Sequence, residues 1–128
     1  MHYLRLCCFM KKTLVTGASE NPARYSNKAI RSLRRHDFEV VALGLRKGIV
    51  LDVPIVTGMP NLPDIDVITL YLSEKNQKMY ESYFIGLHPK TIIFNPGTAN
   101  SSLERKALDA GIKVLHECTL VLLTMGAY

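Results

Sequence analysis

The chain has 128 residues, of which 48% are hydrophobic, so it can bury the core of one compact domain but is too short for two. Its formal net charge is +5, and the segment 24–47 alone holds seven basic and two acidic side chains, which accounts for the whole excess. Such a local positive charge is either a solvated helix face or a site for an anionic partner. The odd number of cysteines, three, shows no disulfide framework and predicts a cytoplasmic protein.

The first nine residues, MHYLRLCCF, differ from the rest of the chain. Their apolar run is short and contains Arg5, which is too little for a membrane span or a signal-peptide core. The following MKKTLV is typical of a protein start at Met10. We therefore expect residues 1–9 to be an extension outside the fold, residues 10–128 to form one domain, and the protein to have no membrane partner.

Short apolar runs predict strands at 13–17, 39–44, 53–57, 66–72, 91–95 and 112–116. They are continuous β-branched and aliphatic runs, as in strands that are covered on both faces. Pro54 restricts the third run to a short or edge strand.

Amphipathic segments between these runs predict helices. The first covers residues 26–36, and the second covers 74–87 with Ser73 as its N-cap. Residue spacing directs four side chains of the second helix toward the core: Met79, Tyr80, Tyr83 and Phe84.

The segment SSLERKALDAG predicts a further helix. Ser101 and Glu104 have the spacing of a capping box, and Leu103, Ala107 and Leu108 form the expected inner stripe. The end of the chain, TLVLLTMGAY, is a helix or a strand, and its pattern favours a helix.

Strands that alternate with helices predict right-handed crossovers and a mainly parallel sheet. The connection 45–53 is too short for a normal helix and 58–65 is a loop, so one crossover is reduced. The expected fold is an α/β, Rossmann-like three-layer domain with five to six strands.

The turn after the first strand is the first candidate site. In doubly wound sheets, ligands bind at the carboxyl ends of the strands, where helix N-termini favour anions. Gly17 permits a tight turn, Ala18 is small, Ser19 offers a hydroxyl, and Ser26 and Asn27 can donate hydrogen bonds to a phosphate. A glycine here also occurs for packing alone.

The residues at the end of the second predicted strand narrow the choice of ligand. An NAD-binding domain places an acidic residue there, whereas this chain has Arg46 and Lys47. Basic residues suit an adenosine ribose that carries a phosphate, as in NADP or coenzyme A. The alternative is a basic loop without a ligand.

The turn NPGT at 95–98 follows the fifth predicted strand and lies at the same expected edge. Asn95 either hydrogen-bonds a ligand amide or holds the turn through backbone groups, and the second role is the more common. Several such loops on one edge are what a ligand crevice requires.

Three motifs together resemble the small single-domain CoA-binding proteins: TGASENPARYSNKAIRSL, NPGTANSSLERKALDAGIKV and ECTLVLL. These proteins are similar to the nucleotide-binding domain of the succinyl-CoA synthetase α subunit, and the resemblance covers nearly all of residues 11–125. It implies a Rossmann-like fold and a coenzyme A site. The segment 17–19 and Pro22 would line the pyrophosphate, Arg46 and Lys47 the 3′-phosphoadenosine, and 71–73 the pantetheine.

Motifs and resemblance together give one set of candidate cofactor-binding residues. They are Gly17, Ala18, Ser19, Asn21, Pro22, Arg24, Tyr25, Ser26, Asn27, Gly44, Arg46, Lys47, Tyr71, Leu72, Ser73, Asn95, Pro96, Gly97, Thr98 and Cys118. Cys118 enters because a thiol at a helix start could form a mixed disulfide with the coenzyme, although a buried structural cysteine is the commoner case.

No catalytic set is apparent in the sequence. His116 and Cys118 are too few for a metal site, and no Ser-His-Asp set, acid pair or phosphate-binding P-loop occurs. The leading hypothesis is therefore a protein that binds coenzyme A or an acyl-CoA as a carrier, sensor or accessory factor, with a homodimer as one possible state. The alternatives are an NADP-type dinucleotide-binding protein or oxidoreductase remnant, and a nucleic-acid-binding module, which lacks any known motif.

Overall fold

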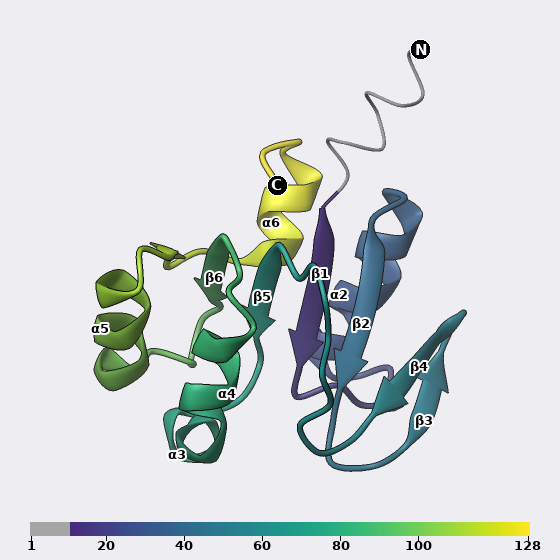
Figure 1. Ribbon diagram of the computed structural model, residues 1–128. Helices are drawn as coiled ribbons and strands as arrows, with labels where there is room; N and C mark the ends of the chain where they lie inside the picture. Colours follow the sequence, from purple (N-terminus) through teal and green to yellow (C-terminus); the bar gives the residue numbers. More distant parts are fainter. Residues whose placement is uncertain (1–10) are drawn as a thin grey trace.

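A computed structural model describes residues 11–128, so the expectation for residues 1–9 lies outside the described residues (Figure 1). The strands are β1 (Lys12–Thr16), β2 (Glu39–Leu43), β3 (Gly48–Val50), β4 (Val53–Val56), β5 (Val67–Leu70), β6 (Thr91–Phe94) and β7 (Lys113–Leu115). They form one sheet in the order β3-β4-β2-β1-β5-β6-β7, with every pair parallel except the antiparallel pair of β3 and β4. The expected α/β, Rossmann-like architecture is confirmed.

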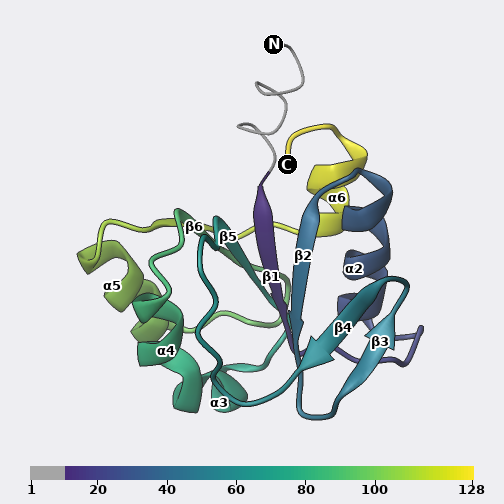
Figure 2. The ribbon, with the colours of Figure 1, turned by 45° about the vertical axis from the view of Figure 1, so that its right-hand side comes forward.

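The helices lie on both faces of this sheet (Figure 2). One face carries α2 (Tyr25–Arg35) and α6 (Thr119–Thr124), so the C-terminal segment is a helix, as its pattern favours. The other face carries α3 (Glu74–Gln77), the 3₁₀ turn η1 (Lys78–Tyr80), α4 (Glu81–Gly86) and α5 (Ser101–Asp109).

Successive side chains of the central strand β1 point to opposite faces of the sheet and pack into two separate hydrophobic cores. Leu14 packs with Phe84 and Leu103 under α4 and α5, whereas the next residue, Val15, packs with Ile30 of α2 on the opposite face. Both side chains are fully buried. Covering on both faces explains why β1 and β5 read as continuous rather than alternating apolar runs.

The sheet has seven strands, not five to six, because the connection after β2 forms a strand. No helix lies between β2 and β4; instead Gly48–Val50 folds back as β3 and pairs antiparallel with β4. The hairpin is tied to α2 by Arg34, whose Nε and Nη2 donate to the two carboxylate oxygens of Asp52 at 3.0 and 2.8 Å. That hydrogen bond lowers the pKa of Asp52.

The helix expected over 74–87 is interrupted, and one of its predicted core residues is wrong. Ser73 is the N-cap of α3, but the chain passes through η1 before α4 begins. The buried stripe consists of Gln77, Tyr80, Glu81 and Phe84 at helical spacing, which leaves Met79 outside it and 67% exposed. Two polar residues occupy this stripe, so hydrophobic periodicity alone locates it poorly.

Two predictions for α5 are also wrong. Asn100 is its N-cap in place of Ser101, because the Asn100 side chain accepts a hydrogen bond from the Leu103 backbone N–H. Leu103 and Ala107 are fully buried, but Leu108 is exposed because it lies one residue, about 100°, around the helix from Ala107. None of the helices in residues 11–128 is long and apolar enough to cross a membrane.

Candidate functional site

The site lies where the strand order reverses. From β1 the chain moves to β2 on one side and later returns to β5 on the other, so the loops after β1 and β5 diverge at their carboxyl ends. This switch point is where open α/β sheets hold ligands. A cavity of about 980 Å³ occupies it, walled by the loops that follow β1, β2, β5 and β6.

Most of the candidate residues line this cavity. All of them do so except Pro22, Asn27, Asn95 and Cys118. Sequence reasoning missed the other lining residues, which are Glu20, Ala23, Leu43, Leu45, Ile55, Asn76 and Tyr80. Glu20, Ala23, Leu43 and Leu45 lie within or directly beside segments of the candidate set, and Ile55 and Tyr80 are buried residues of neighbouring elements. Asn76 is an exposed residue of α3 that no sequence signal marks.

The loop after β1, residues 17–24, is called the first loop, and close backbone packing fixes its position. Gly17 has φ +71°, and a Cβ atom there would lie 3.0 Å from the carbonyl oxygen of Tyr71. The Ala18 N–H donates to the Leu43 carbonyl oxygen at 3.0 Å, which extends the sheet pairing beyond the end of β1. The glycine therefore serves the turn and the packing that place Ser19 at the cavity.

The N-terminus of α2 opens on the cavity through Arg24, Tyr25 and Ser26. Arg24 is the N-cap, its side chain makes no capping hydrogen bond, and no acidic residue lies in the first turn. The first N–H groups of a helix need partners and carry a partial positive charge. This end of α2 thus offers an anion-binding surface.

Asn27 supports the first loop rather than the cavity wall. Its Nδ2 donates to the Ser19 carbonyl oxygen at 2.8 Å, and its Oδ1 accepts from Arg31 Nε at 2.8 Å. It is 1% exposed. Both ends of the amide are engaged within the protein, so a donation from Asn27 to a phosphate would come from its backbone N–H in the first turn of α2.

Arg46 and Lys47 line the cavity from the loop after β2. Both are exposed, and neither takes part in a salt bridge within residues 11–128. Nearby, the Glu20 carboxylate accepts a hydrogen bond from the Ile49 backbone N–H at 3.0 Å. That contact ties the first loop to the edge strand β3 across the cavity rim.

Asn95 has a structural role: its carbonyl oxygen accepts from the Thr98 N–H at 3.1 Å within the turn, and its side chain bonds to neighbouring elements. Its Nδ2 donates to Thr69 Oγ1 at 2.7 Å and to the Leu70 carbonyl oxygen at 2.8 Å, while its Oδ1 accepts from the Thr119 N–H at 2.9 Å. Of the two roles considered for Asn95, the structure shows the structural one. The side chain joins β5, β6 and the start of α6 beneath the cavity.

Cys118 and Tyr71 differ in their relation to the cavity. Cys118 is a half-buried free thiol directly before α6 and is not among the residues that line the cavity. Tyr71 lines the cavity, but its hydroxyl is buried and has no hydrogen-bond partner among the described residues. Burial raises the pKa of Tyr71 to about 12, so the phenol is neutral at physiological pH. Residues 11–128 hold no cluster of three His, Cys, Asp or Glu side chains that could bind a metal ion.

Fold and site together define an α/β domain with a positive, open cavity at its topological switch point, the form of a nucleotide- or coenzyme-binding domain. The chain belongs to the CoA binding domain family, whose model matches residues 11–124. This confirms the family resemblance seen in the sequence.

Solved structures share this fold. A crystal structure of an uncharacterized protein is 39% identical, with a TM-score of 0.90 over 93% of this chain and 98% of that chain. A hypothetical protein from Pyrococcus horikoshii OT3 is 24% identical, with a TM-score of 0.80 over 94% of this chain and 86% of that chain.

A similar domain occurs within a larger enzyme. The dinucleotide-forming acetyl-coenzyme A synthetase 1 of Ca. Korarchaeum cryptofilum, in complex with phosphate and ADP, is 18% identical with a TM-score of 0.69. The match covers 84% of this chain but 25% of that chain, and at this identity it concerns the fold alone. No curated protein matches the chain.

Proposed function

We propose that this protein binds coenzyme A, free or acylated, in the cavity at the carboxyl edge of the sheet, as a carrier, sensor or accessory protein. One observation carries the proposal: in a chain of the CoA binding domain family, the N-terminus of α2 borders the same cavity as Arg46 and Lys47, and these two cations form no salt bridge within residues 11–128. A volume of about 980 Å³ is at the upper end of cofactor sites, which span about 300–1,000 Å³.

The pyrophosphate belongs at the first loop and the start of α2. Gly17, Ala18 and Ser19 bring backbone close to the ligand, and the first N–H groups of α2 supply donors and a positive dipole end. Ser26 is almost fully buried at this point and can donate through its hydroxyl. Helix N–H groups thus replace the additional glycines of the usual dinucleotide fingerprint.

Arg46 and Lys47 are assigned to the phosphate on the adenosine ribose. Charge-assisted hydrogen bonds to a phosphate are about twice as strong as neutral ones. The acidic side chain that would hold an unphosphorylated ribose is absent after β2, and the nearby Glu20 carboxylate is engaged by Ile49. These features favour CoA or NADP over NAD.

The pantetheine is assigned to the remaining wall. Tyr71, Leu72 and Ser73 approach from the loop after β5, and Pro96, Gly97 and Thr98 from the loop after β6. A mixture of apolar side chains and backbone amide groups suits an arm that alternates methylene groups with amides.

The alternatives receive less support from the geometry. Nucleic-acid binding through α2 would use Arg24, Lys28, Arg31 and Arg35, and of these Arg31 already donates from Nε to Asn27 Oδ1. NADP shares the charge pattern of CoA and remains the competing ligand. The proposal places the protein in the cytoplasm, in keeping with a free thiol at Cys118.

Calorimetric titration with CoA, dephospho-CoA, NADP and NAD tests this function. The proposal predicts that CoA binds most tightly and that dephospho-CoA binds at least about tenfold more weakly, since one charged hydrogen-bonded group is lost. Binding of NADP in preference to CoA would support the dinucleotide alternative. Absence of binding to all four ligands would refute the proposal.

A further inference from the structure

The helices on the cavity side carry two buried polar side chains one turn apart, Gln77 and Glu81. Gln77 is fully buried and Glu81 is 4% exposed. They share the inward stripe with Tyr80 and Phe84, where apolar residues are the rule. Buried polar groups of this kind are costly unless every donor and acceptor is paired.

The side-chain amide of Gln77 joins two cavity loops. Its Nε2 donates to the Leu72 carbonyl oxygen at 2.8 Å and to the Thr98 carbonyl oxygen at 2.7 Å. Leu72 belongs to the loop after β5 and Thr98 to the loop after β6, and both line the cavity. A single NH₂ group therefore links the two loops and sets the distance between them.

Asn100 fixes the orientation of this amide. Asn100 Nδ2 donates to Gln77 Oε1 at 3.0 Å, so the NH₂ group of Gln77 must face the two carbonyl oxygens. The same Asn100 Nδ2 donates to Glu81 Oε2 at 2.9 Å. The α5 N-cap thus connects Gln77 to Glu81.

Glu81 anchors the other end of the network. Its Oε1 accepts from Ser102 Oγ and from Lys106 Nζ, each at 2.9 Å. Burial acts to raise the pKa of Glu81, but the hydrogen bonds from Asn100, Lys106 and Ser102 outweigh it and hold the pKa below its ordinary value. A charged, fully bonded carboxylate gives the network a rigid base.

We propose that Gln77 is a positioning residue for the pantetheine half of the site, acting through the Leu72 and Thr98 backbone. The inference rests on the proposed function, because it assigns that half of the cavity to the coenzyme arm. Within residues 11–128, none of the hydrogen bonds of this network involves the first loop, Arg46 or Lys47. Gln77 therefore controls affinity for the arm without controlling affinity for the phosphorylated adenosine.

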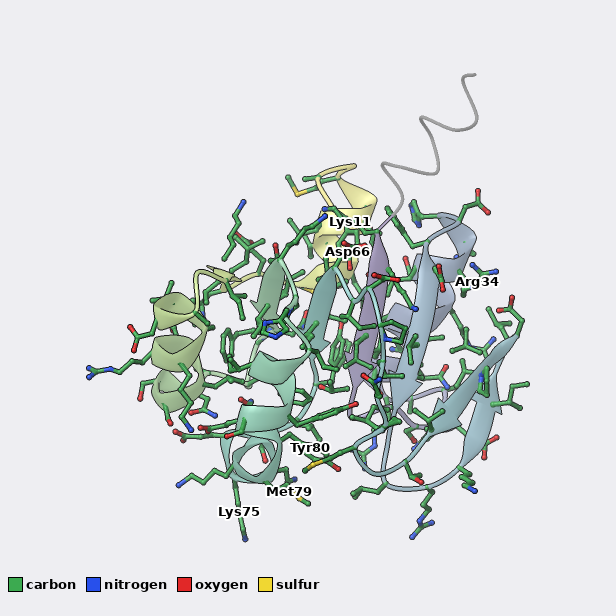
Figure 3. All side chains as sticks on the ribbon, in the orientation of Figure 1. Lys11, Arg34, Asp66, Lys75, Met79 and Tyr80 are labelled. Atoms are coloured by element: carbon green, nitrogen blue, oxygen red, sulfur yellow. The ribbon has the colours of Figure 1, made fainter. Side chains whose placement is uncertain are left out.

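The test compares whole CoA with adenosine 3′,5′-bisphosphate, which lacks the arm. Gln77→Glu keeps the size of the side chain but replaces the donor with an oxygen that faces two carbonyl oxygens. Gln77→Asn keeps the amide but shortens its reach, and it serves if the first variant fails to fold. Lys75→Gln is the control, because Lys75 lies on the same short helix and points away from the protein (Figure 3).

For either Gln77 variant, calorimetry should show CoA affinity reduced by about tenfold or more, with bisphosphate affinity within about twofold of wild type. Lys75→Gln should bind both ligands as the wild type does. A Gln77 variant that binds CoA as tightly as wild type, or whose affinities for both ligands fall equally, would overturn this inference but leave the proposed function standing. A wild-type protein that binds no CoA would overturn the proposed function together with it.

Discussion

Gly44 packs directly against the backbone of Ala18. A side chain at position 44 would place its Cβ atom 2.5 Å from the Ala18 carbonyl oxygen, well inside van der Waals contact. The two residues lie in the loops that follow the neighbouring strands β1 and β2, and the Ala18 N–H is itself bonded to the Leu43 carbonyl oxygen. The missing side chain of Gly44 thus allows the first cavity loop to lie against the second.

Replacement of this glycine should therefore strain both loops. Because the nearest atom is backbone and cannot rotate away, Gly44→Ala should lower the free energy of unfolding by about 1–3 kcal/mol, as in other overpacked sites. Urea denaturation measures this change. Gly86→Ala is the control: nothing lies within 4 Å of its added Cβ, and alanine at the end of α4 should be neutral or stabilising by up to about 1 kcal/mol. An equal change in the free energy of unfolding for Gly44→Ala and Gly86→Ala would contradict this packing argument.

Asn95 should prove to be a structural residue. Asn95→Asp keeps an acceptor for the Thr119 N–H but loses both donations, to Thr69 Oγ1 and the Leu70 carbonyl oxygen. We expect a loss of about 2–4 kcal/mol in the free energy of unfolding, because buried groups are left unpaired beside a carboxylate. Asn61→Asp, at an exposed loop position, should change it by less than about 0.5 kcal/mol. A stable Asn95→Asp protein would show that the buried network is dispensable.

Glu81 should make stability dependent on acid pH. Its pKa in the folded protein lies below its ordinary value of 4.5, so its contribution is complete above that value and is lost as the pH falls through the folded pKa. Glu81→Gln cannot ionise, so its stability should fall less steeply between about pH 5 and pH 3 than that of the wild type. Urea unfolding at several pH values gives both curves. The control is Glu74→Gln at an exposed position of α3, whose curve of unfolding free energy against pH should follow that of the wild type. A Glu81→Gln curve that runs parallel to the wild-type curve would refute the role given to the Glu81 carboxylate.

Sequence patterns located the loops of the site because glycine and proline mark strand ends. Gly17, Gly44 and the turn at 95–98 follow continuous apolar runs, and the carboxyl ends of parallel strands meet at one edge. The helix of residues 25–35 was equally clear, because Ile30 and Leu33 alternate with basic residues. Sixteen of the candidate residues accordingly share one cavity wall.

The remaining features depend on tertiary partners that no local pattern reveals. Strand β3 has three residues, and its Gly48–Val50 segment becomes a strand only because β4 pairs with it and Glu20 bonds its edge. Gln77 and Glu81 read as polar surface residues until Asn100 and the carbonyl oxygens of Leu72 and Thr98 surround them. Their burial is a property of the assembled loops.

The most direct test of the central claim combines a change in the protein with a change in the ligand. Affinities of CoA and dephospho-CoA are measured calorimetrically for the wild type and for Arg46→Ala/Lys47→Ala. Arg105→Ala/Lys113→Ala is the control, since it removes the same charge from exposed positions outside the cavity wall.

If Arg46 and Lys47 hold the 3′-phosphate, replacing both with alanine should lower the affinity for CoA by about ten- to a hundredfold and the affinity for dephospho-CoA by much less. The reason is that each charged hydrogen bond contributes about 1.5–3 kcal/mol, and solvent partly screens it at these exposed positions. The control leaves both affinities near those of the wild type. Equal weakening of the two ligands by Arg46→Ala/Lys47→Ala would contradict the proposed orientation of the coenzyme.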